Sequence, residues 1–189
     1  MDVLNSPDRG GGVHGQEGRR WSTSALPRLG GFVLAYVLLY ALVNASEAVP
    51  RWFIESVTVP SATWAVNLVH DLPTPARAAG SRIVAEGGGL NVLQGCEGLD
   101  VLGLWLAAMV SAPLSLRGRV LGATVGTAVV FVFNQIRLVS LFGLHRHGRE
   151  WFDDAHGLWW PVILVLLVYG LFVLWQHWFT PPPCTAAAA

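Results

Sequence analysis

The feature that most constrains the fold is an uncharged apolar run from Gly157 to Phe179, near the end of the sequence. As a helix it would extend about 34 Å, which is enough to cross the hydrocarbon core of a bilayer, about 30 Å thick. Only 13% of the 189 residues are charged and 53% are hydrophobic, whereas soluble domains carry about 25% charged residues. The sequence therefore predicts an integral membrane protein.

Three more stretches are long and apolar enough to be read as spans. They are Leu29–Ser46, Gly98–Leu116 and Val120–Leu144. Together with the run that ends at Phe179, they predict an all-α membrane bundle of about four transmembrane helices. A competing interpretation treats the first stretch as a secretory signal with a cleavage-like site at residues 46–48.

The expected domain organisation is a disordered cytoplasmic tail over residues 1–28, a membrane domain over 29–179 and a low-complexity tail over 180–189. Within the membrane domain, Val59–Leu72 has the apolar spacing of a short amphipathic helix lying at the membrane interface. Ser81–Glu86 and Leu90–Gln94 flank three glycines, a pattern that predicts a small extracytoplasmic β-hairpin.

Orientation follows from basic residues in short loops, which favour the cytoplasm. Arg117 and Arg119 lie in the turn between the second and third spans, and Arg19, Arg20 and Arg28 precede the first. Both regions are therefore expected on the cytoplasmic side of the plasma (inner) membrane. The net charge is zero and the twelve basic residues, all Arg, form no block, so nucleic acid is not an expected partner.

This topology predicts that three reactive residue types meet at the outer rim of the bundle. Cys96 lies 21 residues before Arg117, and Arg137 lies 18 residues after Arg119. These separations correspond to about 32 Å and 27 Å of helix. His156 directly precedes the last span, which is expected to start on the outer side. Cys184 follows that span on the opposite side, so a disulfide with Cys96 is excluded.

Each of the three residues has a structural and a chemical interpretation. Cys96 is either an inert small hydrophobe or a nucleophile whose pKa is lowered by a helix start and a nearby Arg. Arg137 either snorkels to the interface or belongs to a polar patch with Asn134, three residues earlier. His156 is either an interfacial histidine or an acid–base group. Its rivals, His145 and His147, are expected in a solvated loop.

The motifs around these residues resemble those of the exosortase/archaeosortase family, most of all its short exosortase H branch. Gly95–Leu99 reads GCEGL, Asn134–Leu138 reads NQIRL and Trp151–His156 reads WFDDAH. Their order matches the family's signature of Cys, then N-x-x-R, then His. The resemblance extends roughly over 32–178.

The resemblance implies a membrane cysteine transpeptidase, over residues 29–179, that needs no cofactor or metal. Its catalytic residues would be Cys96, Arg137 and His156. Its partners would be membrane lipid and exported proteins that carry a C-terminal motif, a transmembrane helix and a basic cluster. Cleavage would proceed through an acyl-thioester on the extracytoplasmic face.

Other polar residues near the motifs are expected to assist. Asn134, Glu97 and Asp153 are the candidate substrate-binding residues, and Glu97, Asp153 and Asp154 are the candidates to orient His156, among which the sequence does not choose. Two other classes of function remain open. One is a non-enzymatic membrane scaffold or assembly protein, and the other is a metal or haem protein that uses the histidines at 145, 147 or 156.

Overall fold

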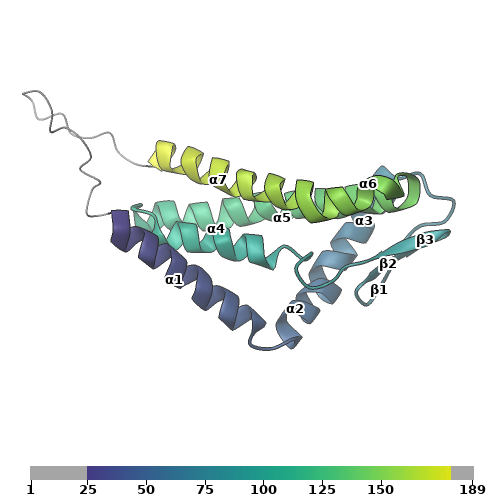
Figure 1. Ribbon diagram of the computed structural model, residues 1–189, viewed down its shortest axis with the longest axis horizontal. Coiled ribbons are helices and arrows are strands. Elements are labelled where there is room, and N and C mark those ends of the chain that lie inside the picture. The colour runs from purple at the N-terminus through teal and green to yellow at the C-terminus, as the bar shows by residue number, and fades with distance from the viewer. Residues whose placement is uncertain (1–24, 180–189) are drawn as a thin grey trace, which may run out of the picture.

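The computed structural model describes residues 25–179, which form a mostly helical chain with one small sheet (Figure 1). The elements are α1 (Ala25–Asn44), α2 (Ala48–Phe53), the π-helical turn η1 (Ile54–Thr58), α3 (Val59–Val69), β1 (Arg77–Ala79), β2 (Arg82–Ala85), β3 (Gly88–Asn91), α4 (Leu99–Ser111), α5 (Leu116–His147), α6 (Arg149–Asp154), the π-helical turn η2 (Ala155–Trp159) and α7 (Trp160–Phe179). In Figure 1, α1, α4, α5 and α7 run side by side, and α2, α3, α6 and the sheet gather at one end.

Three helical segments are long and apolar enough to cross a membrane: Leu26–Asn44, Leu116–His147 and Arg149–Phe179. In the first, none of the apolar window is buried inside the protein, and in the third only 11% is. Such apolar surfaces are incompatible with water but suit contact with lipid tails. The chain is therefore a helical membrane protein.

The expected second span, Gly98–Leu116, is shorter in the structure. α4 has 13 residues and ends at Ser111, so it extends only about 20 Å. Ala112 is extended, with φ −67° and ψ 142°, because the ring of Pro113 disfavours a helical conformation in the residue before it. In place of the about four expected transmembrane helices, the structure has three helices long enough to span a membrane and one shorter apolar helix, α4.

The last two helices also differ from the expected boundaries. α5 runs on to His147, so His145 and His147 lie in its final helical turn and not in a loop. The final helix begins at Arg149 and continues without a break to Phe179. His156 therefore lies about two turns inside a helix, not at its start.

Two prolines explain the π-helical turns. η1 ends at Thr58, two residues before Pro60, and η2 ends at Trp159, two residues before Pro161. A proline inside a helix lacks an N–H donor, and its ring collides with the preceding turn. A single wider turn relieves that collision while the helix continues. The chain can therefore pass through both prolines without ending a helix.

The predicted hairpin is present as β2 and β3, with Ile83 opposite Leu90. The structure adds a third strand, β1, which pairs with β2 in an antiparallel order β1-β2-β3. All three residues of β1 are exposed, so the strand has no alternating apolar pattern by which sequence could identify it.

The predicted tails and the interfacial helix have different outcomes. α1 begins at Ala25, so the last four residues of the predicted 1–28 tail are helical; residues 1–24 and 180–189 lie outside the described part. The predicted helix at Val59–Leu72 is α3, which ends at Val69. Trp64 on its surface is 69% exposed. Its location at a membrane interface stays a prediction.

Glycines in α5 let two tryptophans pack closely against that helix. The indole Nε1 of Trp105, from α4, donates to the Gly122 carbonyl at 3.1 Å. Nε1 of Trp175, from α7, donates to the Gly118 carbonyl at 3.0 Å. A Cβ placed on Gly126 would lie 2.0 Å from the Trp105 ring. Small residues at such positions allow membrane helices to approach each other closely.

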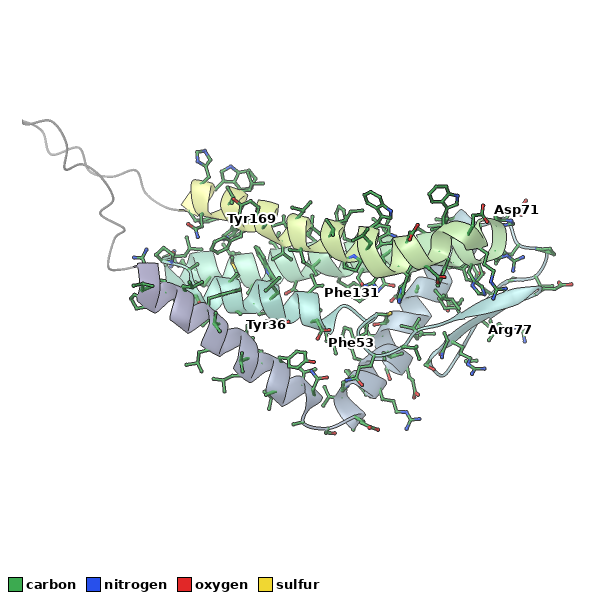
Figure 2. All side chains as sticks on the ribbon, in the orientation of Figure 1. Tyr36, Phe53, Asp71, Arg77, Phe131 and Tyr169 are labelled. Carbon is green, nitrogen blue, oxygen red and sulfur yellow. The ribbon has the colours of Figure 1, made fainter. Side chains whose placement is uncertain are left out.

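Apolar contacts join the long helices to the segments gathered at one end, which are α2, α3, α6 and the sheet. Phe53 packs against the cluster formed by Leu102, Trp105, Met109 and Val168. Figure 2 shows Phe53 where the α2 segment meets the bundle, with Arg77 on the sheet beyond it and Tyr169 toward the opposite end. The α2 segment is therefore fixed to α4 and α7.

Replacing Gly126 by Ala should destabilise the bundle by about 1–3 kcal/mol, the usual cost of overpacking a filled interior. Trp105 is fully buried and cannot move aside freely. Gly170→Ala in α7 is the control, because a Cβ there would meet nothing within 4 Å. Unfolding of both variants in mixed detergent micelles measures the difference. Equal stability of the two variants would contradict this account of the packing.

Candidate active site

Cys96 lies in the loop between β3 and α4. Its backbone N–H donates to the Leu93 carbonyl at 3.0 Å. The glycines on either side, Gly95 and Gly98, have φ values of 90° and 86°, a region that glycine enters without strain. These turns direct the loop back across the end of the bundle toward α5. The half-buried Cys96 thus comes three residues before α4 instead of opening it.

Asn134 of α5 fixes this loop in place. Its Nδ2 donates to the Glu97 carbonyl at 3.0 Å and to the Cys96 carbonyl at 3.3 Å. Only 1% of Asn134 is exposed. A Cβ on Gly98 would lie 2.8 Å from the Asn134 amide carbon, so position 98 requires glycine for space as well as for φ. Asn134 therefore positions the backbone of the loop that carries Cys96.

Arg137 approaches the thiol from the next turn of the same helix. Its Nη2 lies 3.9 Å from Cys96 Sγ, and the side chain is 5% exposed. Asn134 and Arg137 are three residues apart, so they share one helical face. The Arg137 Nε is buried and has no hydrogen-bond partner among the described residues. A buried cation with an unused donor is able to bind a developing negative charge.

His156 approaches the thiol from the π-helical turn η2. Its Nε2 lies 3.9 Å from Cys96 Sγ. The ring is stacked on Phe152, with centroids 5.8 Å apart and planes inclined by 9°. Phe152 in turn contacts His145 edge-on, at 5.5 Å. The imidazole is therefore held by an aromatic stack that connects η2 to the end of α5.

None of the three candidate carboxylates forms a hydrogen bond with His156. His156 Nδ1 is buried and has no hydrogen-bond partner among residues 25–179. Asp153 and Asp154 are exposed on α6. Glu97 is 2% exposed, yet its Oε2 also lacks a partner in the described chain. The described contact that holds the ring is the stack on Phe152, whereas a carboxylate holds the imidazole in known catalytic triads.

The pKa of Cys96 is shifted in the direction opposite to the one expected for an activated nucleophile. Burial raises the pKa of Cys96 above its ordinary value; the Arg137 cation lowers it and the Glu97 carboxylate raises it, but burial is the largest effect. Burial also raises the pKa of Glu97 above the usual range, against backbone N–H groups that lower it. The dipole of α4 gives little help because it begins only at Leu99. Burial therefore favours the neutral thiol form of Cys96 over the thiolate.

The structure thus brings Cys96, Arg137 and His156 together from a loop, α5 and η2. His147 is exposed at the end of α5, and Cys184 lies outside the described residues. No group of three or more His, Cys, Asp or Glu side chains in the described residues could hold a metal ion. The histidines of the metal or haem hypothesis therefore have no such cluster to join.

Sequence reasoning missed two residues that shape this site. Phe152 was not singled out, although its place four residues before His156 puts both rings on one helical face. Sequence alone places Gly98 only within the GCEGL motif, because its contact with Asn134 joins residues far apart in the chain.

Comparison of the chain with protein-family models, curated proteins and solved structures gives no match.

The rate at which iodoacetamide alkylates Cys96 should still be rising at pH values above the ordinary thiol pKa, since only the thiolate reacts. Arg137→Gln should move the midpoint to higher pH, because the cation that lowers the pKa is lost. Glu97→Gln should move it to lower pH, because a carboxylate that raises it is lost. Mass spectrometry in a Cys184→Ala background measures each profile. Shifts of the same sign in both variants would contradict this electrostatic description.

Proposed function

We propose that the chain is a membrane-embedded cysteine transpeptidase that cleaves sorting signals of exported proteins close to the membrane surface. The observation that carries the proposal is that Cys96 Sγ lies 3.9 Å from both His156 Nε2 and Arg137 Nη2. A nucleophile, a base and a cation that can bind an oxyanion are the three groups that acyl transfer requires. The motif order shared with the exosortase/archaeosortase family supports the same chemistry.

The first half of the reaction forms a thioester. His156 Nε2 takes the proton of the Cys96 thiol as Sγ attacks the scissile carbonyl carbon. The carbonyl oxygen becomes an oxyanion, and the Arg137 guanidinium stabilises it; a single oxyanion donor contributes about 3–4 kcal/mol in known enzymes. The C–N bond then breaks, and the leaving amine takes the proton from His156. The acyl group remains on sulfur.

The second half transfers that acyl group. His156, now neutral, removes a proton from an incoming amine or water, which attacks the thioester carbonyl. The C–S bond breaks, and Cys96 recovers its proton from His156. One histidine suits both halves because imidazole gains and loses a proton near neutral pH. The raised pKa of Cys96 also fits, since the sulfur then stays uncharged until His156 removes its proton during the attack.

The location of the site supports a substrate that is itself anchored in the membrane. Cys96 precedes α4, at the end of the bundle that carries α2, α3 and the sheet (Figure 1). Arg117 and the start of α1 lie at the opposite end, where positive charge favours the cytoplasm. The catalytic end would therefore face outward in the plasma (inner) membrane, level with a bond just outside a transmembrane anchor.

A purely bracing role for these residues is less consistent with the structure. In a scaffold, buried polar groups are paired, because an unpaired one costs about 1–3 kcal/mol. Arg137 Nε, His156 Nδ1 and Glu97 Oε2 are all buried without partners in the described chain. Thr58, Asn134, Gln135 and Arg146 also have such atoms, but unused donors on Arg137 and His156, the two side chains beside the thiol, are more typical of a site that binds a substrate.

Cys96→Ala should abolish processing of a co-expressed exported protein that carries a C-terminal sorting signal. The variant loses the nucleophile but no membrane helix, so it should accumulate normally in the membrane. Cys184→Ala is the control and should process at the wild-type rate. Mass spectrometry of the mature substrate C-terminus identifies both the bond cleaved and the acceptor. Processing by Cys96→Ala would defeat the proposal.

His156→Ala should lower the processing rate at least about a hundredfold, the lower end of acid–base contributions. His147→Ala should cost little, since His147 is an exposed histidine on α5. Phe152→Leu should fall between them, because it leaves the imidazole in place but removes the ring on which it stacks. Rates are measured by pulse-labelling of the substrate. A greater loss in His147→Ala than in His156→Ala would assign the acid–base role elsewhere.

A further inference from the structure

A groove lies between α1, α4 and α7 at the end of the bundle opposite Cys96. Its cavity volume is about 480 Å³. One wall is Leu29 and Phe32 of α1, the other is α7 from Val165 to Gln176, and the floor is the last turns of α4. The floor includes the small residues Ala108 and Ala112. Figure 2 shows Tyr169, which lines this groove, on α7 away from the sheet.

The length of the groove matches one leaflet of a bilayer. Val165 to Gln176 extends about 16 Å along α7, and half of a hydrocarbon core about 30 Å thick is about 15 Å. Trp178, just beyond the groove, is 64% exposed, and exposed tryptophans at the end of a transmembrane helix mark the interface. The groove therefore runs from the interface toward the middle of the membrane.

Positive charge lies at the interface end of the groove. Arg28, in the first turns of α1, lines that end, and no acidic residue within 25–179 forms an ion pair with it. The adjoining turn leads into Arg117 and Arg119. The nine acidic residues of the described chain all fall within 47–100 and 150–154, on the segments at the other end. Among the described residues, this end therefore carries arginines but no acidic side chain that could neutralise their charge.

We propose that the groove binds one anionic phospholipid, with an acyl chain along α4 and the phosphate on Arg28. A planar guanidinium matches phosphate oxygens geometrically as well as in charge. The lining of the groove between its two ends is almost wholly apolar, which suits an acyl chain. An extended acyl chain is narrow enough to fit between the two walls. The lipid would fill the space between α1 and α7 and hold α1 against α4.

The test uses the full chain in nanodiscs of phosphatidylglycerol and phosphatidylcholine with identical acyl chains, in equal amounts. After release into mild detergent, native mass spectrometry measures which lipid stays bound. Wild-type protein should retain phosphatidylglycerol preferentially. Arg28→Gln should lower that retention about fivefold, the effect of one basic residue near a membrane surface. Val165→Trp, which fills the groove from an exposed wall, should lower retention of both lipids.

Arg117→Gln is the matched control, because it removes a charge at the same end from an exposed residue that does not line the groove. It should retain lipid as the wild type does. Cys96→Ala should also do so, since the lipid site is independent of the chemistry at the other end. Equal retention of the two lipids, or an equal loss in Arg117→Gln, would overturn the proposal. A dimer that Val165→Trp dissociates, with no lipid retained, would overturn it in favour of a second copy.

Discussion

The candidate site depends on the pair of hydrogen bonds from Asn134 to the carbonyls of Cys96 and Glu97. These two bonds connect α5 to a loop almost forty residues earlier in the sequence. The Asn134 side chain that donates them is buried, with almost no contact with solvent. In that environment an unpaired carbonyl is costly, so the loop has a strong preference for this one position. Arg137, one turn further along α5, is thereby placed beside the thiol. The same helix fixes both the backbone of Cys96 and the cation beside its thiol.

The helices around this contact divide the molecule into two ends with different chemistry. At one end, burial and unpaired polar groups surround Cys96, with His156 held on a wider turn before Pro161. At the other end, glycines and tryptophans bring α4, α5 and α7 close together, and Arg28 caps an apolar groove. Polar groups are costly in contact with lipid tails, whereas apolar helix surfaces suit them. Separating them along the helix axis keeps each in a suitable environment.

The aromatic stack of His145, Phe152 and His156 gives the site an unusual means of orientation. In many acid–base sites a carboxylate holds the imidazole through one ring nitrogen. Here the Nδ1 atom is free of partners in the described chain, and the ring is fixed by its face. That arrangement leaves the imidazole without a charged neighbour in hydrogen-bond contact. It also couples the position of His156 to the end of α5, the helix that carries Arg137.

The sequence by itself determined the membrane class, the helical architecture, the β2–β3 hairpin and the three residues that meet at the thiol. These follow from composition, from hydrophobic runs and from the rise of a helix, which are properties of short segments. Tertiary structure decided what depends on distant contacts: the pairing of β1, the fixing of the loop by Asn134 and the role of Phe152 beside His156. It also decided the direction in which the pKa of Cys96 is shifted, since burial is set by the whole fold and outweighs the one cation that sequence could place nearby.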